Sequence, residues 1–263
     1  MIECLERFGR HSLLSYKALF GWLDPKVYLL VMVLNPLSQL LFFSVLVNYV
    51  YKGEGLSGYI GSNALLLCVM NSVFGIMSVI TSDRGMGTLQ LVMTSPVNKA
   101  GLFLSRSIAH VLNGLITSGL GLLFGIIIFQ VSIPFEALLP LSFVWAVSIF
   151  SACGLGLIVG CFCLWTPSMH LLSNLLASIL LLLSGANYPH SIMPEWLGHF
   201  SQFIPLTRGV QLTKAILNEG DYSLVLTLLG EEFLLGCCFF VISFVFIKHA
   251  EYLSRVKGTM DLN

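Results

Sequence analysis

Six long apolar runs constrain this chain more strongly than any other feature of its sequence. Each run holds about 20 residues or more, which as a helix matches the roughly 30 Å hydrocarbon core of a bilayer. The runs are continuously apolar and do not alternate as the strands of a membrane barrel would, so helices are expected. They lie near residues 27–50, 60–81, 101–130, 138–164, 168–187 and 229–248.

Few charged residues are available to cover a soluble surface. The 263 residues include 13 Lys and Arg and 13 Asp and Glu, whereas 56% are hydrophobic. A soluble domain of this length needs a more charged shell, and a net charge of zero offers no footprint for nucleic acid. We therefore expect an all-α integral membrane protein with six transmembrane helices over 27–248, in contact with the lipid bilayer and with no nucleic-acid partner.

The basic residues predict how these helices are oriented. With six spans both chain ends lie on one side, and ten of the 13 Lys and Arg residues fall on that side. Cytoplasmic loops carry the excess of Lys and Arg, so we expect both termini, the tail 249–263 and the polar residues 82–100 to be cytoplasmic. No signal-peptide cleavage site precedes the first run, which is expected to act as its own insertion signal.

Residues 1–26 predict a cytoplasmic helix that lies in the membrane interface. Apolar and polar side chains alternate there at roughly helical spacing, which is typical of an amphipathic interfacial helix with Tyr16 and Trp22 at headgroup depth. A frayed terminus is the alternative. Asp24-Pro25 then turns the chain toward the first span, because the residue before a proline resists helical geometry.

The segment at about 188–222, between the fifth and sixth runs, departs from a simple helical bundle. Pro189, Pro194 and Pro205 prevent a single helix from running through it. The segment is nevertheless too apolar and aromatic for a solvated loop. We expect short helices at the outer face before the last span, with Trp196 as an interfacial anchor.

One polar island separates the second and third apolar runs. It spans Ser82–Leu91 and continues into Ser95–Lys99. Lipid cannot solvate these residues, so they must face water or another protein. Gly85 and Gly87 allow a tight turn and a close approach of another backbone.

The island also contains the signals of a short helix. Thr88 can cap its start, and Pro96 ends it. The apolar side chains between them, which suit insertion into a groove of a partner, are Leu89, Leu91, Val92 and Met93. A solvated reverse turn is the alternative, and it explains the glycines but not this apolar run.

These parts, in this order, resemble the ABC type-2 transporter permeases, the membrane subunits of ATP-binding cassette exporters. Members have an N-terminal interfacial helix, six spans, a Gly-Thr-Leu-Glu-like motif after the second span, a Ser-Pro turn and a Pro-x-Trp-like element before the last span. The matching residues here are Asp83-Arg84, Gly87-Thr88-Leu89-Gln90, Thr94-Ser95-Pro96-Val97, Pro189, Met193-Pro194-Glu195-Trp196 and Ile204-Pro205-Leu206-Thr207. Gln90 stands where the family usually has Glu.

The resemblance implies a division of labour between subunits. In the family, a cytoplasmic coupling helix after the second span, at about 84–97 here, sits in a cleft of a separate ATPase subunit that binds ATP and Mg²⁺. The chain itself has no Gly-x-x-x-x-Gly-Lys-Ser/Thr phosphate loop, and we expect it to hold no cofactor. The residues expected to couple to the ATPase are Asp83, Arg84, Gly85, Gly87, Thr88, Leu89, Gln90 and Pro96.

The resemblance also implies a second permease, which is either a copy of this chain or a paralogue. The expected location is the cell inner (cytoplasmic) membrane. The short loops favour an exporter or flippase of an amphiphilic compound, such as a drug, a peptide, a lipid or a lipid-linked glycan. In the family, the second and fifth spans line the substrate path.

Polar residues inside the apolar runs are candidates for a substrate path, because lipid penalises them. Hydrogen bonding between helices is the alternative role. The candidates are Asn35, Gln39, Asn63, Asn71, His170 and Asn174.

Two other classes of function need groups that the sequence does not offer. A polytopic membrane enzyme needs clustered catalytic groups, and an ion-coupled carrier needs an inverted repeat with ionisable residues at the midplane. The six histidines show no His-x-x-x-His or His-Glu-x-x-His spacing. The sequence therefore predicts neither catalytic nor metal-binding residues.

Overall fold

A computed structural model describes residues 35–163 and 169–257, with a few single positions among residues 9–34. The interfacial helix expected over 1–26 lies outside the described part except for some of these single residues. The last residues of the expected tail, 258–263, also lie outside it.

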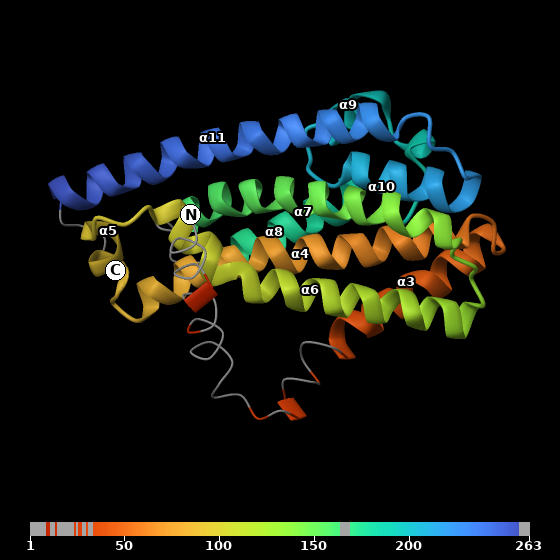
Figure 1. Cartoon of the computed structure of the whole chain (residues 1–263), viewed down its shortest axis with the longest axis horizontal. Helices are drawn as coiled ribbons and strands as arrows, with labels where there is room; N and C mark the ends of the chain where they lie inside the picture. The colour runs from red at the N-terminus through yellow and green to blue at the C-terminus, as the bar shows by residue number, and fades with distance from the viewer. Residues whose placement is uncertain are drawn as a thin grey trace.

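The described residues form helices and contain no strand (Figure 1). In chain order the elements are α3 (Asn35–Tyr51), α4 (Leu56–Gly85), α5 (Leu89–Thr94), α6 (Lys99–Phe129), α7 (Phe135–Cys163), α8 (Met169–Leu183), the short turn η2 (His190–Ile192), α9 (Glu195–Ser201), α10 (Thr207–Lys214), the π-helical η3 (Ala215–Glu219) and α11 (Val225–Lys257). Each of the six predicted apolar runs overlaps one helix, which confirms an all-α membrane protein for this part of the chain.

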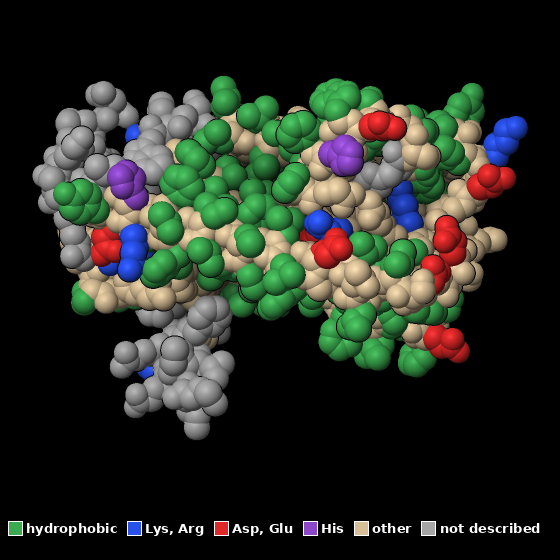
Figure 2. All heavy atoms as spheres, turned by 90° about the horizontal axis from the view of Figure 1, so that it is seen from above, with side chains coloured by type: hydrophobic (Ala, Val, Ile, Leu, Met, Phe, Trp, Pro, Cys, Tyr) green, Lys and Arg blue, Asp and Glu red, His purple; other side chains and the backbone are tan. Residues whose placement is uncertain are grey.

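Four of these helices are long and apolar enough to cross a bilayer. They are Leu56–Gly85, Lys99–Phe129, Phe135–Cys163 and Val225–Tyr252. α3 and α8 are apolar but have 17 and 15 residues, so they reach about 26 and 22 Å and fall short of the hydrocarbon thickness. Six spans therefore stay a prediction. Apolar side chains cover much of the face in Figure 2, as a surface in lipid requires.

Helix α4 is the centre of the bundle. Most of its residues from Leu56 to Ile80 are buried, and it packs against α3, α6, α7, α8 and α10. Apolar side chains occur on all its sides, and a helix of this kind is stable only where other helices surround it. α11 packs against α7 and runs along the whole length of the bundle (Figure 1).

The segment between α8 and α11 is anchored inside the bundle by α10 and η3. α10 packs against α4, α7 and α11. The Asn218 side-chain oxygen accepts a hydrogen bond from the Gly58 N–H at 2.8 Å, at the start of α4. Short helices thus occur here as expected, but α10 is largely buried, and an outer-face location for the segment stays a prediction.

A half-buried lysine strengthens this anchor. Lys214 Nζ donates hydrogen bonds to the carbonyl oxygens of Gly185 (2.6 Å) and Tyr188 (3.1 Å). It also lies 4.0 Å from the centre of the Tyr59 ring on α4. Burial lowers the pKa of Lys214 to about 7, and the two carbonyls and the ring stabilise the charged form against this cost of burial.

The crossing of α4 and α6 generates a prediction. A Cβ at Gly114 would lie 3.1 Å from the Cys68 carbonyl oxygen and 3.3 Å from Cys68 Cα. Because these are backbone atoms that cannot rotate away, Gly114→Val should separate the helices and lower the melting temperature by roughly 5 °C. Thermal unfolding of the purified chain in detergent measures this.

Gly119→Val is the matched control on the same helix, because no atom lies within 4 Å of a Cβ at Gly119. Its melting temperature should stay close to that of the wild type. Equal melting temperatures for the two variants would show that the α4–α6 crossing does not need the glycine.

Candidate functional site

The predicted polar island forms the connection from α4 through α5 to α6. α4 continues through Arg84 to Gly85, and Gly87 follows with a φ of +69°, a left-handed conformation that favours glycine. α5 holds only six residues, and the chain is extended at Ser95. The helix is therefore shorter than the expected range 84–97, because a tight turn takes up Met86–Thr88.

A buried ion pair fixes the start of this connection. Asp83, 3% exposed, accepts a hydrogen bond from Arg106 Nη1 of α6 at 2.5 Å. The Thr88 hydroxyl donates back to the Asp83 carbonyl oxygen at 3.2 Å. Thr88 occupies the N-cap position of α5 but makes no side-chain cap bond, so the predicted capping role is wrong and Thr88 instead closes the turn onto Asp83.

Two further bonds tie the connection to other helices. Lys99, 5% exposed, donates to Glu251 of α11 at 2.8 Å and to the Ser95 carbonyl oxygen at 2.6 Å. Arg84 Nη1 donates to the Cys163 carbonyl oxygen at the end of α7 at 3.2 Å. The residues on both sides of α5 are therefore fixed to α7 and α11, and α5 itself packs against α4 and α11.

The apolar side chains of α5 divide between the bundle and the surface. Leu89 and Met93 are fully buried in a cluster that includes Phe103 of α6 and Ile247 of α11. Leu91 points outward and is 72% exposed. The expected apolar insertion of four side chains is thus wrong for Leu89 and Met93, because the bundle itself binds them.

The remaining predicted coupling residues lie on the surface around Leu91. Gly85, Gly87 and Pro96 are exposed, and Gln90 is partly exposed. Met86 and Val97 are also exposed apolar residues of this surface, although they were not among the individual residues expected to couple to the ATPase. We call the exposed residues Gly85, Met86, Gly87, Leu91, Pro96 and Val97 the α5 surface.

Sequence reasoning also missed the residues that hold α5 in place. Arg106, Lys99 and Glu251 are these residues. Lys99 and Arg106 could have been found as charges beside the island in a chain with few charges. Glu251 could not be found in this way, because it lies far from the polar island in the sequence.

The candidate path residues do not gather at one place. Asn63 and Asn71 donate hydrogen bonds to the carbonyl oxygens one turn earlier in α4, those of Tyr59 (3.0 Å) and Leu67 (2.9 Å). These bonds lie within α4, so they neither line a substrate path nor connect two helices.

The other candidates lie on the two short apolar helices. His170 and Asn174 are exposed on α8, Gln39 is partly buried on α3, and Asn35 begins α3. A path along α3 and α8 would therefore leave out the asparagines of α4.

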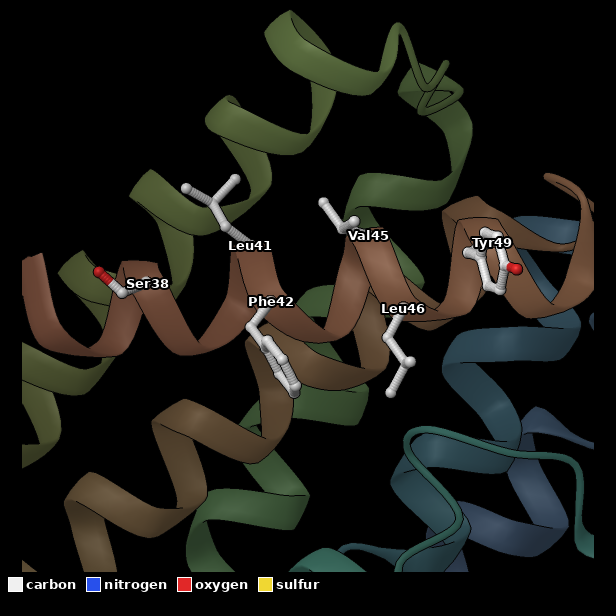
Figure 3. Close-up of a pocket in the computed structure, with 6 residues that line it drawn as sticks. All are labelled: Ser38, Leu41, Phe42, Val45, Leu46 and Tyr49. Carbon is white, nitrogen blue, oxygen red and sulfur yellow. The ribbon is translucent and has the colours of Figure 1, made fainter.

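Two apolar cavities lie on α3 and α8. The first has a volume of about 590 Å³ and follows a single stripe of α3, with Leu41 and Val45 on one side and Phe42 and Leu46 on the other (Figure 3). Its lining residues are Ser38, Leu41, Phe42, Val45, Leu46 and Tyr49. The second, of about 400 Å³, is lined by Phe43, Ser178, Leu181, Leu182, Asn187 and Tyr188. Among the described residues, no three His, Cys, Asp or Glu side chains lie close enough to hold a metal ion.

Comparison with known proteins gives the class to which this arrangement belongs. Residues 12–218 match the ABC-2 type transporter family. Because this match covers most of the chain, the protein belongs to the ABC-2 type transporter family and is a multi-pass transport permease embedded in a membrane. The match includes α5 and ends in η3, so α11 lies beyond it.

Two curated relatives carry the same kind of name. The chain is 26% identical over 161 residues to the inner membrane transport permease YhhJ of Escherichia coli (strain K12), and equally to that of Shigella flexneri. The similar region covers 59% of this chain and 43% of each relative. The chain thus spans less than half of the length of these relatives.

The ion pair between Asp83 and Arg106 generates a prediction. Asp83→Ala leaves Arg106 without its partner and should destabilise the α4–α5 turn by about 3 kcal/mol, near the lower end for a buried pair because Arg106 is partly exposed. Trypsin should then cleave after Arg84 several-fold faster in the purified chain, as mass spectrometry of the fragments will show.

Glu54→Ala removes an exposed carboxylate from the turn between α3 and α4 and is the control. It should leave cleavage after Arg84 unchanged. Wild-type cleavage of the Asp83→Ala protein would contradict the role assigned to the ion pair.

Proposed function

We propose that this chain is the permease subunit of an ATP-binding cassette exporter, in which separate ATPase subunits bind ATP and Mg²⁺. The observation that carries the proposal is the exposed Leu91 on α5, a helix whose Leu89 and Met93 are buried in the bundle. An apolar side chain on a short fixed helix suits a helix-in-groove contact. Burial of Leu91 in such a groove contributes about 1.5–3 kcal/mol to binding.

The attachments of α5 explain how a partner can drive the permease. The Asp83–Arg106 pair joins α4 to α6 just before α5 in the chain, and the Lys99–Glu251 pair joins α6 to α11 just after it. An ATPase that holds Leu91 and changes conformation therefore moves several helices at once. The permease needs no chemistry of its own for this step, since the work comes from ATP hydrolysis on the partner.

The proposed topology has six spans across the inner membrane. Both termini and α5 lie on the cytoplasmic side, and the end of the bundle that contains α9 faces outward. The sequence is apolar from residue 27 onward, so the proposed first span begins before α3, and local thinning of the bilayer would accommodate the short α8. Basic residues support the orientation. The α5 end carries Arg84, Lys99, Arg106 and Lys248, and the other end carries Lys52, Arg208 and Lys214.

A second permease, either identical or a paralogue, is proposed to complete the substrate path. The cavities on α3 and α8 are open and almost wholly apolar, and a facing subunit would enclose them. Apolar walls with a few polar groups suit an amphiphile. The proposed cargo is therefore a drug, a peptide, a lipid or a lipid-linked glycan, and it is exported.

Leu91 provides the test of the ATPase contact. Leu91→Glu places a charge in the proposed groove and should reduce recovery of the ATPase with the purified permease at least tenfold, with little change in melting temperature because Leu91 makes no core contact. Co-purification from cells that produce both proteins measures this.

The matched control is Leu226→Glu, since Leu226 is as exposed as Leu91 but lies at the opposite end of the bundle. It should leave ATPase recovery unchanged. If Leu91→Glu and Leu226→Glu bind the ATPase equally well, α5 is not the docking helix.

Cysteine labelling tests the topology. Met86→Cys and Ile192→Cys place thiols at two exposed positions, one beside α5 and one in η2. A membrane-impermeant maleimide should label residue 192 in intact cells and residue 86 only after the cytoplasmic membrane is permeabilised. Peptide mass spectrometry reads each site separately from the native cysteines. Labelling of residue 86 in intact cells would contradict the proposed orientation.

A further inference from the structure

α11 contacts both ends of the permease through acidic side chains. At one end Glu251 pairs with Lys99 beside α5, and at the other Glu232 and Glu231 contact the start of α10. Figure 1 shows α11 running without interruption between these two places. This helix lies outside the part of the chain that matches the family.

We propose that Glu251 and Glu232 are positioning residues of the transport cycle, which make α11 a rigid link that moves α10 when α5 moves. The proposal rests on the proposed function of α5 as the ATPase contact. It adds a role for the last helix and a connection between the two ends of the chain.

The contact at α10 joins a backbone N–H to one oxygen of a buried carboxylate. Leu206, just before α10, has a φ of +102°, which is a strained conformation for a residue with a Cβ. Its N–H donates to Glu232 Oε1 at 2.9 Å, and Glu232 is 1% exposed. A carboxylate at this depth requires partners, so the backbone of Leu206 and the side chain of Glu232 hold each other in place.

Arg208, two residues after Leu206, adds to this contact. Its Nε donates to Glu231 Oε2 at 2.9 Å, and its Nη1 lies 3.9 Å from Glu232 Oε2. Nη1 also donates to the Gln202 carbonyl oxygen at 2.7 Å, between α9 and α10. A displacement of α11 at this level therefore has to move the start of α10.

The contact at α5 is equally direct. Besides the Lys99–Glu251 pair, Ile247 and Ala250 of α11 are buried in the same cluster as Leu89 and Met93. α5 cannot shift against α11 without opening this cluster, and the neighbouring Lys99 of α6 is fixed to α11 by a largely buried ion pair. A continuous helix of about 28 Å separates Glu232 from Glu251.

Glycines let α7 and α11 pack closely against each other. A Cβ at Gly154 of α7 would meet the Phe239 Cβ at 2.8 Å, and a Cβ at Gly236 of α11 would meet the Ser151 Cα at 3.0 Å. Glycines on both sides bring the backbones close, and Phe150 of α7 packs against Phe233 and Phe240 of α11 at the same level. Small sliding of packed helices is a common form of conformational change.

Movement of α11 would change the contacts that α10 makes with α4 and α7. Gly209 of α10 lies against Ser148 of α7 and Leu65 of α4, and Thr213 faces Gly61 of α4. α10 therefore covers the end of the central helix. Its displacement by α11 changes how closely that end of the bundle is packed, which is the end where cargo would leave.

The first test uses the purified chain in lipid nanodiscs. Thr207→Cys places a thiol at the fully buried first residue of α10, and the rate of maleimide modification, read at that peptide, reports on α10. Glu251→Gln, at the far end of α11, should raise this rate at least threefold. Lys248→Gln, an exposed position one turn away on the same helix, should leave it unchanged.

A second reporter separates movement from unfolding. Ser72→Cys lies fully buried in the middle of α4, and its modification rate should not respond to Glu251→Gln. A rise at both positions means that the variant has loosened as a whole, and this overturns the proposal. The proposal is also overturned if Thr207→Cys is modified by the maleimide at the same rate with and without Glu251→Gln.

The second test adds the ATPase and a non-hydrolysable ATP analogue. Binding should change the Thr207→Cys rate, and Glu251→Gln should abolish that change while the ATPase still binds. If the ATPase binds and the rate stays the same in the wild-type background, the link through α11 is wrong but the docking role of α5 stands. If the ATPase does not bind, the proposed function fails, and the experiment without ATPase still decides the link.

Discussion

The attachment of α5 by the Asp83–Arg106 ion pair is the interaction on which the rest of the arrangement depends. Asp83 is buried at the end of α4, and its carboxylate has to be neutralised there, since an unpaired charge at this depth is strongly unfavourable. Arg106 of α6 supplies the positive charge. The Thr88 hydroxyl donates a hydrogen bond to the Asp83 carbonyl oxygen. Together they fix the turn that gives α5 its direction, with Leu89 and Met93 inward and Leu91 outward.

A chain with so few charges uses them at the places where helices must keep a fixed relation. Lys99 and Glu251 join the α5 region to α11, and Arg208 and Glu232 join α11 to α10. Elsewhere the packing depends on apolar surfaces and on glycines such as Gly114, which let backbones approach closely. The helices are thus fixed to one another at both ends of the bundle, which suits the proposed transmission from one membrane face to the other.

The sequence predicted the helices better than the site. Long apolar runs locate helices because the bilayer demands about 20 apolar residues per span, and the polar island located α5. The directions of Leu89 and Met93 could not be predicted, because Ile247 of α11 helps to bury them and lies far away in the sequence. The strained Leu206 and its partner Glu232 escaped prediction for the same reason, and the asparagines of α4 gave no sign that they bond their own helix.

The most direct test of the account is hydrogen–deuterium exchange of the permease with and without its ATPase. The account predicts that amides of residues 86–97 become protected when the ATPase binds. It also predicts that amides of residues 190–204, at the opposite end of the bundle, gain no comparable protection. Protection confined to 190–204, or an unchanged exchange rate at 86–97 in a complex that has formed, would contradict the claim that α5 is the surface on which the ATPase acts.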